Sequence, residues 1–302
     1  MSLPSPGARL RALMDKGCVP IPGAFNALAA RAIAQAGFQA CYISGAATSV
    51  SAGVPDVGVL TLEHFARAVR EAAEASGLPV LADADTGFGE AEMVRRTVIE
   101  YARAGAAGLH LEDQEFPKRC GHLDGKRLVP ADHMVEKVVW AARARSAIDA
   151  SFIVCARTDA RGVEGMDEAI RRAREYVKAG ADMIFPEGLA SEAEFQQFAH
   201  AMRGGTAGGT PAPRAGPYLL ANMTEFGKTP MIPLARFEQM GYSCVIYPVT
   251  LLRVAMGAVM RALEQLKRDG SAEGFLTGMQ TREELYRLIG YEPGKAWEWP
   301  AR

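Results

Sequence analysis

The chain has 302 residues, of which 49% are apolar and 23% charged, and its formal net charge is −1. These values suit a globular enzyme, and without a block of like charges they argue against a nucleic-acid-binding or membrane-surface protein. No apolar run reaches the roughly 18 residues that cross a bilayer. The first residues lack the apolar run of a signal peptide. We therefore expect a cytoplasmic protein with neither membrane nor nucleic acid as a partner.

Eight short apolar runs recur along the chain, each about the length of a strand. Most are continuously apolar rather than alternating, which is typical of parallel strands buried on both faces. We predict strands over Pro20–Ala24, Ala40–Ser44, Pro79–Asp83, Gly108–Glu112, Phe152–Arg157, Asp182–Pro186, Tyr218–Asn222 and Ser243–Tyr247.

Segments with helical spacing of apolar residues separate these runs, among them Leu62–Ala75, Met93–Ala104 and Met166–Ala179. Several of the helical patterns end in a glycine a few residues before the next apolar run, as in the turn from a helix to a strand. These glycines are Gly37, Gly105, Gly180 and Gly241.

Eight strands alternating with helices predict one (β/α)8 barrel over residues 1–302, with an open doubly wound sheet as the structural alternative. Two further helical patterns, Leu251–Asp269 and Thr281–Ile289, form an extension over residues 251–302. The Gly- and Pro-rich stretch Arg203–Pro217 predicts a flexible surface insertion without a catalytic role.

Polar side chains end six adjacent predicted strands, at the edge where such barrels build active sites. Asp83 and Asp85 share one side of their strand because side chains alternate, and Glu112 ends the next strand. These hard oxygen donors could converge on one cation. Since no His/Cys cluster has zinc spacing, they favour Mg²⁺, or Mn²⁺, over Zn²⁺.

The loop after the fourth strand places Cys120 among Lys118, Arg119 and His122. Cationic neighbours lower the pKa of a thiol and make it a usable proton donor. We therefore assign Cys120, Lys118 and His122 to the catalytic set. Arg157, which ends an apolar strand, is a candidate carboxylate clamp.

The other cysteines give no sign of disulfides. Cys41, Cys155 and Cys244 lie in apolar runs and are expected to act as small buried hydrophobes. The odd number of cysteines fits a reducing compartment.

Longer motifs resemble the isocitrate lyase/phosphoenolpyruvate mutase superfamily along nearly the whole chain. The Lys118–His122 motif is specific to its lyase branch and is most similar to the 2-methylisocitrate and dimethylmalate lyases. The remaining motifs are Tyr42–Gly45, Pro55–Gly58, Asp83–Gly89, Ala104–Gln114, Ala156–Ala160, Phe185–Glu187, Asn222–Gly227 and Met279–Arg282.

The resemblance implies a role for each matching residue. Asp83 and Asp85 would hold Mg²⁺, with Glu112 acting directly or through water, and Cys120 would be the general acid. Tyr42 or a metal-bound group would be the base. A small di- or tricarboxylate substrate would be bound by Ser44, Gly45, Ala46, Asp56, Gly121, Arg157, Glu187, Asn222, Thr224, Arg253 and Arg282.

The resemblance also implies a homotetramer with C-terminal helices exchanged between subunits. The expected reaction is retro-aldol cleavage of 2-methylisocitrate to pyruvate and succinate, as in propionate catabolism. Where such lyases commonly have three glycines, this chain has Gly45-Ala46-Ala47. A 2,3-dimethylmalate lyase, another oxo- or hydroxy-dicarboxylate lyase and an oxaloacetate hydrolase therefore stay open, as does a non-catalytic metabolite-binding barrel.

Overall fold

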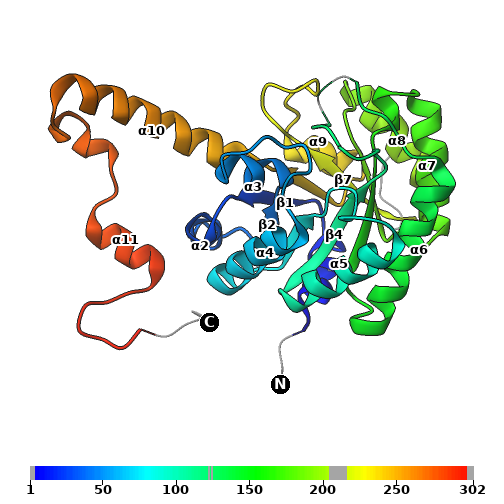
Figure 1. Cartoon of the computed structure of the whole chain (residues 1–302), viewed down its shortest axis with the longest axis horizontal. Helices are drawn as coiled ribbons and strands as arrows, with labels where there is room; N and C mark the ends of the chain where they lie inside the picture. Colours follow the sequence, from blue (N-terminus) through cyan, green and yellow to red (C-terminus); the bar gives the residue numbers. More distant parts are fainter. Residues whose placement is uncertain (1–3, 122, 124, 204–215, 298–302) are drawn as a thin grey trace.

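The computed structural model describes residues 4–121, 123, 125–203 and 216–297. Eight parallel strands form a closed barrel, with β8 pairing back to β1 (Figure 1). The predicted (β/α)8 barrel is confirmed, and this closing pair rules out the open sheet. The strands are β1 (Val19–Ala24), β2 (Cys41–Ile43), β3 (Val80–Asp83), β4 (Ala106–Glu112), β5 (Ile153–Thr158), β6 (Met183–Pro186), β7 (Tyr218–Asn222) and β8 (Cys244–Tyr247).

Helices surround the barrel, and three of them, α4, α5 and α7, match predicted helical segments to within two residues at each end. The helices are α1 (Pro6–Met14), α2 (Ala27–Gln35), α3 (Gly45–Ser51), α4 (Leu62–Ser76), α5 (Ala91–Arg103), α6 (Ala131–Ile148), α7 (Met166–Lys178), α8 (Glu192–Arg203), α9 (Leu234–Gln239), α10 (Thr250–Asp269) and α11 (Arg282–Ile289), with short 3₁₀ turns η1 (Ala160–Gly162) and η2 (Glu273–Gly278).

Two hydrophobic layers explain why the strands read as continuously apolar. Ile21, Leu81 and Leu220 belong to the cluster inside the barrel, which Leu10 and Met14 of α1 join. The alternate residues of the strands pack outward against the helices in a second, larger cluster. Both faces of the strands are thus buried, as the sequence pattern predicted. The four predicted helix-ending glycines all have positive φ angles, between 86° and 111°.

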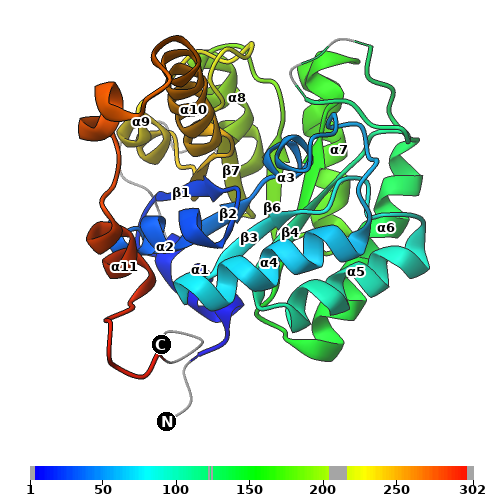
Figure 2. The same ribbon diagram turned by 60° about the vertical axis from the view of Figure 1, so that its left-hand side comes forward.

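The helices after β8 do not complete the helical ring. We call residues 250–289, which comprise α10, η2 and α11, the arm. It starts beside β1 and leaves the barrel (Figures 1 and 2), and its last helix packs beside α2. Apolar side chains along the arm stay exposed; they are Val254, Met256, Val259, Met260, Leu263, Leu266, Leu276, Met279 and Leu285.

Two further sequence predictions concern the surface of the fold. The insertion predicted over Arg203–Pro217 lies mostly outside the described residues, because 204–215 are not among them. In the part of the chain that the structure describes, every helix is too short or too polar to cross a membrane.

Candidate active site

The carboxyl ends of the strands surround a cavity of about 90 Å³. It lies at the end of the barrel where this fold places its active sites. Residues from β2, β3, β5, β6, β7 and α10 meet there with the loop after β4. The predicted site residues that line it are Tyr42, Ser44, Ala46, Asp56, Asp83, Lys118, Cys120, Gly121, Arg157, Glu187, Asn222, Thr224 and Arg253.

A larger cavity, of about 570 Å³, lies outside the barrel beside α4, α5 and α6. Of the predicted site residues that the structure describes, only Asp85 borders it. Size therefore does not identify the active site here. The smaller cavity is the better candidate because charged strand ends converge on it.

Asp83 and Asp85 point toward one small volume beside the backbone of Gly45. The amide of Gly45 donates to Asp83 Oδ2 at 3.0 Å, and the amide of Asp85 donates to Asp83 Oδ1 at 3.0 Å. A Cβ atom on Gly45 would lie 2.7 Å from Asp83 Oδ2 and 3.1 Å from Asp85 Oδ1. The two carboxylates thus form a cradle that a side chain at position 45 would fill. Asp85 has a φ of 45°, a left-handed conformation that Asp tolerates better than most residues.

The cradle fits a divalent cation that prefers oxygen. Asp85 Oδ1 is buried, and Lys118 Nζ lies 2.8 Å from it as its charged partner. Mg²⁺ is usually held by one or two carboxylates and keeps water or substrate oxygens in its other positions. Among the described residues no group of three or more His, Cys, Asp or Glu side chains forms a metal cluster. The donor set therefore suits Mg²⁺ better than Zn²⁺.

Glu112 does not join the two aspartates in a three-carboxylate cluster. Its Oε2 lies 3.0 Å from Arg157 Nη1, and neither of its oxygens accepts a hydrogen bond in the described structure. Burial raises the pKa of Glu112 well above its usual range, against the opposing charges of Arg157 and Lys118. In this arrangement Glu112 faces the arginine, which favours a contact with a cation through water over direct ligation.

Lys118 places a fixed positive charge beside the cradle. Its ammonium pairs with Asp85 at 2.8 Å and, more closely, with Asp56. Burial alone would lower the pKa of Lys118, but Glu112, Asp85, Asp83 and Asp56 outweigh it and raise that pKa. Burial and the charge of Asp83 raise the pKa of Asp85 to about 6. Lys118 therefore stays cationic at neutral pH, whereas the carboxyl group of Asp85 gains and loses its proton about one pH unit below neutrality.

The loop that carries Cys120 is seated on this same rim. The side-chain amide of Gln114 binds both backbone groups of Arg119, at 2.8 and 2.9 Å. A Cβ on Gly121 would lie 2.5 Å from Arg157 Nη2 and 2.4 Å from Glu187 Cγ. Only glycine lets the backbone approach these side chains so closely. Cys120 lies between these two anchored residues and lines the cavity.

Tyr42 is buried inside the barrel with His110. The phenol oxygen lies 2.7 Å from His110 Nε2, and the two rings stack with centroids 5.8 Å apart. Burial lowers the pKa of His110 to about 4 and raises that of Tyr42. Both groups are therefore neutral at pH 7. As a neutral phenol, Tyr42 is better suited to donating a hydrogen bond than to removing a proton.

Polar groups from β6, β7 and α10 complete the wall. The amide of Asn222 donates to Glu187 Oε2 at 3.1 Å. Arg253 lies 3.0 Å from Glu225 Oε2, and its guanidinium sits 5.4 Å from the ring centre of Phe226. Arg253 is thus held at the rim, where a carboxylate of a ligand could bind it.

Four of the described predicted site residues do not line the cavity: Gly45, Asp85 and Glu112 contact residues that do, whereas Arg282 lies apart from it. Arg282 begins α11 in the arm and is not among the residues that line the cavity. Within one chain it does not complete this site. His122 lies outside the described residues.

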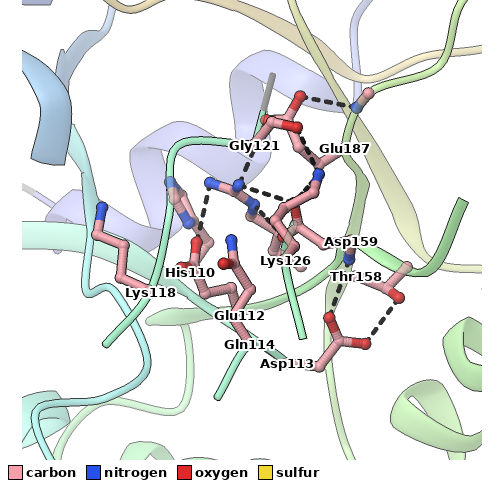
Figure 3. A network of polar contacts seen from close by, with 12 residues as sticks. His110, Glu112, Asp113, Gln114, Lys118, Gly121, Lys126, Thr158, Asp159 and Glu187 are labelled. Carbon is pink, nitrogen blue, oxygen red and sulfur yellow. Dashed lines mark hydrogen bonds and ion pairs between the residues drawn. The ribbon is translucent and has the colours of Figure 1, made fainter. Parts of the chain in front are cut away.

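Behind the cavity lies a buried network to which the sequence prediction gave no role (Figure 3). Asp113 accepts from Thr158 Oγ1 at 2.7 Å, from the Asp159 amide at 2.9 Å and from Tyr176 at 2.8 Å. Asp159 in turn binds Arg157 through two contacts of 2.9 and 3.2 Å. The signal available in the sequence was only that Asp113 and Asp159 follow strand-end residues.

Known proteins resemble this chain over most of its length. Residues 10–267 match the phosphoenolpyruvate phosphomutase family model. A probable 2-methylisocitrate lyase of Corynebacterium glutamicum is 52% identical, with 90% of this chain and 85% of that protein covered. The 2-methylisocitrate lyase of Bacillus subtilis is 46% identical, with 94% and 89% covered.

Solved structures agree with these relatives. A crystal structure of 2,3-dimethylmalate lyase superposes with a TM-score of 0.87 at 36% identity, covering 96% of this chain and 93% of that one. A phosphonopyruvate hydrolase bound to oxalate and Mg²⁺ gives a TM-score of 0.81 at 30% identity, with 95% of each chain covered. Matches of this extent, on a barrel whose charged mouth is intact, show that the chain belongs to the isocitrate lyase/phosphoenolpyruvate mutase superfamily and is a carbon–carbon lyase of the 2-methylisocitrate lyase type.

Proposed function

We propose that this lyase cleaves the C2–C3 bond of (2R,3S)-2-methylisocitrate and releases pyruvate and succinate. The observation that carries the proposal is that Asp83, Arg157 and Cys120 line one cavity. A retro-aldol cleavage needs these three groups: a metal-binding carboxylate, a cation for the developing charge and an acid for the new carbanion.

Asp83 and Asp85 are the residues that would hold Mg²⁺, with Mn²⁺ as the alternative. When bound, the ion supplies Lewis acidity toward the 2-hydroxyl group and its neighbouring carboxylate. Glu112, turned toward Arg157, would act on it through water. The amide of Gly45 keeps Asp83 oriented for this role.

The protein's own groups then remove one proton, stabilise the electron pair of the broken bond and donate one proton. A base removes the proton of the 2-hydroxyl, the C2–C3 bond breaks, and its electron pair moves onto the succinate fragment as an aci-carboxylate. Arg157 stabilises this charge. The thiol of Cys120 donates its proton to the carbon, so that the proton gained balances the one lost from the hydroxyl.

The base lies on the carboxylate side of the cavity. Tyr42 is disfavoured because burial raises its pKa and its neighbour His110 is neutral. That leaves the surroundings of Asp83 and Asp85 as the place where the hydroxyl loses its proton.

Polar wall residues would bind the carboxylates of the substrate. Arg253 can exchange its contact with Glu225 for a carboxylate at the rim, and Asn222, Thr224 and Glu187 would orient the remaining oxygens. Ser44, Gly45, Ala46, Asp56 and Gly121 would contact the substrate from the start of α3 and from the loops after α3 and β4.

A substrate panel tests the proposal. With Mg²⁺ present, pyruvate and succinate should appear from 2-methylisocitrate at a higher kcat/KM than pyruvate and propionate from 2,3-dimethylmalate. EDTA should abolish the activity, and added Mg²⁺ should restore it. Faster turnover of dimethylmalate, or hydrolysis of oxaloacetate as the main activity, would contradict the assignment.

One observation keeps 2,3-dimethylmalate cleavage as the second candidate. The solved dimethylmalate lyase superposes over 96% of this chain, and of Gly45-Ala46-Ala47, which follow Ser44, Ala46 lines the cavity. Ala46 would shape the space near a methyl or carboxymethyl branch of the substrate.

We also propose that the chain works as a homotetramer in which arms are exchanged between subunits. Support comes from the exposed apolar side chains along α10 and from the departure of the arm from its own barrel (Figure 1). Such an exchange would bury the arm and could bring Arg282 of one subunit to the cavity of another.

We propose a cytoplasmic location in an organism that degrades propionate. Within the described residues the five cysteines are all free thiols, which suits a reducing compartment.

A further inference from the structure

Lys126 joins the loop that carries Cys120 to Asp159, in the buried network behind the cavity. Its ammonium donates to the carbonyl oxygen of Gly121 and, at 2.8 Å, to Asp159 Oδ1 (Figure 3). The side chain is 5% exposed, and that of Asp159 is fully buried. A buried ammonium shared between a carboxylate and a carbonyl makes strong, charge-assisted hydrogen bonds.

These contacts close a short ring around the active-site arginine. Lys126 binds Asp159, Asp159 binds Arg157 at 2.9 and 3.2 Å, and Arg157 packs against the backbone of Gly121. Gly121 returns to Lys126 through its carbonyl oxygen. The position of the loop and the position of Arg157 are therefore coupled through one lysine.

Cys120 lies between two anchors of different kinds. On one side, Gln114 holds both backbone groups of Arg119 with neutral amide hydrogen bonds. On the other side, Lys126 holds the Gly121 carbonyl. The direction of the thiol depends on both ends of this three-residue span. Because a hydrogen bond with an ionised partner is roughly twice as strong as a neutral one, the single charged anchor is comparable in strength with the two amide hydrogen bonds.

We propose that Lys126 is a positioning residue for the reaction: it holds the Cys120 loop over the cavity in register with Arg157. Lys126 itself touches neither the proposed substrate nor the reacting atoms. The inference rests on the acid role proposed for Cys120, but the position of the loop can be measured without turnover.

The fold should survive loss of this lysine. The carboxylate of Asp159 would keep its two contacts with Arg157, and the backbone amide of Asp159 would still donate to Asp113. No buried carboxylate would therefore be left unpaired. The matched control is Arg127→Met. Arg127 is the next residue and equally cationic, but its exposed side chain pairs with Glu115 away from the ring.

The experiment measures iodoacetamide alkylation of Cys120 by peptide mass spectrometry in wild type, Lys126→Met, Lys126→Arg and Arg127→Met. Rates are compared between variants at one pH and one reagent concentration; Cys18 cannot serve as a reference, because burial raises its pKa to about 12 and leaves little thiolate. We expect Lys126→Met to raise the alkylation rate of Cys120 relative to wild type by about tenfold, the effect of losing one such hydrogen bond. Lys126→Arg should restore most of the protection, and Arg127→Met should match wild type.

Kinetics supply the second readout. Lys126→Met should lower kcat by about tenfold or more while KM changes by less than about threefold, because the misplaced thiol affects proton transfer more than binding. Unchanged Cys120 alkylation in folded Lys126→Met, or an equal increase in Arg127→Met, would overturn the proposal. If Cys120 proves dispensable for turnover, the acid role fails, while the alkylation ratio still decides whether Lys126 positions the loop.

Discussion

The mouth of the barrel, formed by the carboxyl ends of the strands, and the arm differ in which side chains they bury. At the mouth, charged groups are buried but paired within the chain; Asp159, for example, is held by Arg157 and Lys126. In the arm, apolar groups are exposed, with Val254 67% and Leu263 54% accessible. The comparison indicates that the charges at the mouth are satisfied within one chain, while the arm leaves apolar surface exposed, as the proposed exchange of arms requires.

The largest expected effect, on turnover, tests whether the mouth carries the chemistry, and it concerns Cys120. Cys120→Ser should lower kcat by about 10²–10⁴-fold, the contribution of a positioned acid, because an alcohol is a much weaker acid than a thiol. Succinate binding in the presence of Mg²⁺, followed by calorimetry, should persist. Cys18→Ser, which changes a thiol outside the cavity, is the control. Turnover near that of wild type in Cys120→Ser would remove the thiol from the mechanism.

The second effect tests whether the mouth depends on its buried partners. Asp113→Ala should lower the free energy of unfolding by about 3–5 kcal/mol, because three buried donors and Arg172 lose their acceptor. Denaturant unfolding measures this, with Glu136→Ala on the exposed face of α6 as the control. A loss below about 1 kcal/mol would show that the network is dispensable.

The third effect is a pH dependence of metal binding. Because the pKa of Asp85 is raised to about 6, protons should compete with Mg²⁺ below that pH and weaken its affinity by up to about tenfold per unit. Above pH 7 the affinity should be nearly constant. Calorimetric titration of the metal-free protein between pH 5 and 8 checks this; a flat profile would rule out Asp85 as the titrating ligand.

The same shift predicts how the metal-free fold responds to pH. Between about pH 4 and 6, folded Asp85 keeps a proton that the unfolded chain has lost, so its contribution to stability falls as pH rises through this window. Asp85→Asn should therefore raise the melting temperature of the metal-free protein at pH 7, relative to wild type. A lower melting temperature would contradict the assignment of Asp85 as a destabilised carboxylate.

The smallest effect on the chain itself belongs to the arm. Leu263→Ser should change the unfolding free energy of an isolated subunit by less than about 0.5 kcal/mol, since the side chain is exposed. Its effect should appear instead in assembly, as a lower molar mass by light scattering. Leu252, the buried residue at the start of α10, is the contrasting position. An unchanged mass for both Leu263→Ser and a double Met260→Ser, Leu263→Ser variant would argue against arm exchange.

The strands were predictable because their signal is local. Each run from Val19–Ala24 to Cys244–Tyr247 is mostly apolar, since both of its faces are buried, and apart from the buried His110 the charged side chains stand at the carboxyl ends of the strands. The barrel topology then brings those ends together, which is why Asp83, Arg157 and Glu187, all named from the sequence, line one cavity. The path of the arm was not predictable, because helical spacing says nothing about where a helix docks.

The details of the site depend on the reach of individual side chains. Glu112 was expected beside the aspartates, yet it lies against Arg157. Lys126 and Asp159 are six and thirty-nine residues from Cys120, counted along the sequence, and no periodicity links them to it. Such pairings are decided by packing between loops, which a single sequence does not encode in any local pattern.

Gly45 has a consequence for redesigning this protein. The amide at this position orients Asp83, and a Cβ atom added here would lie within 3.1 Å of both carboxylates that are proposed to hold the cation. The single methyl group of a Gly45→Ala variant would therefore fill the space between Asp83 and Asp85. If the proposed metal site is correct, the Gly45→Ala variant would not bind Mg²⁺. The steps that need the ion could then be separated from those that the polypeptide performs by itself.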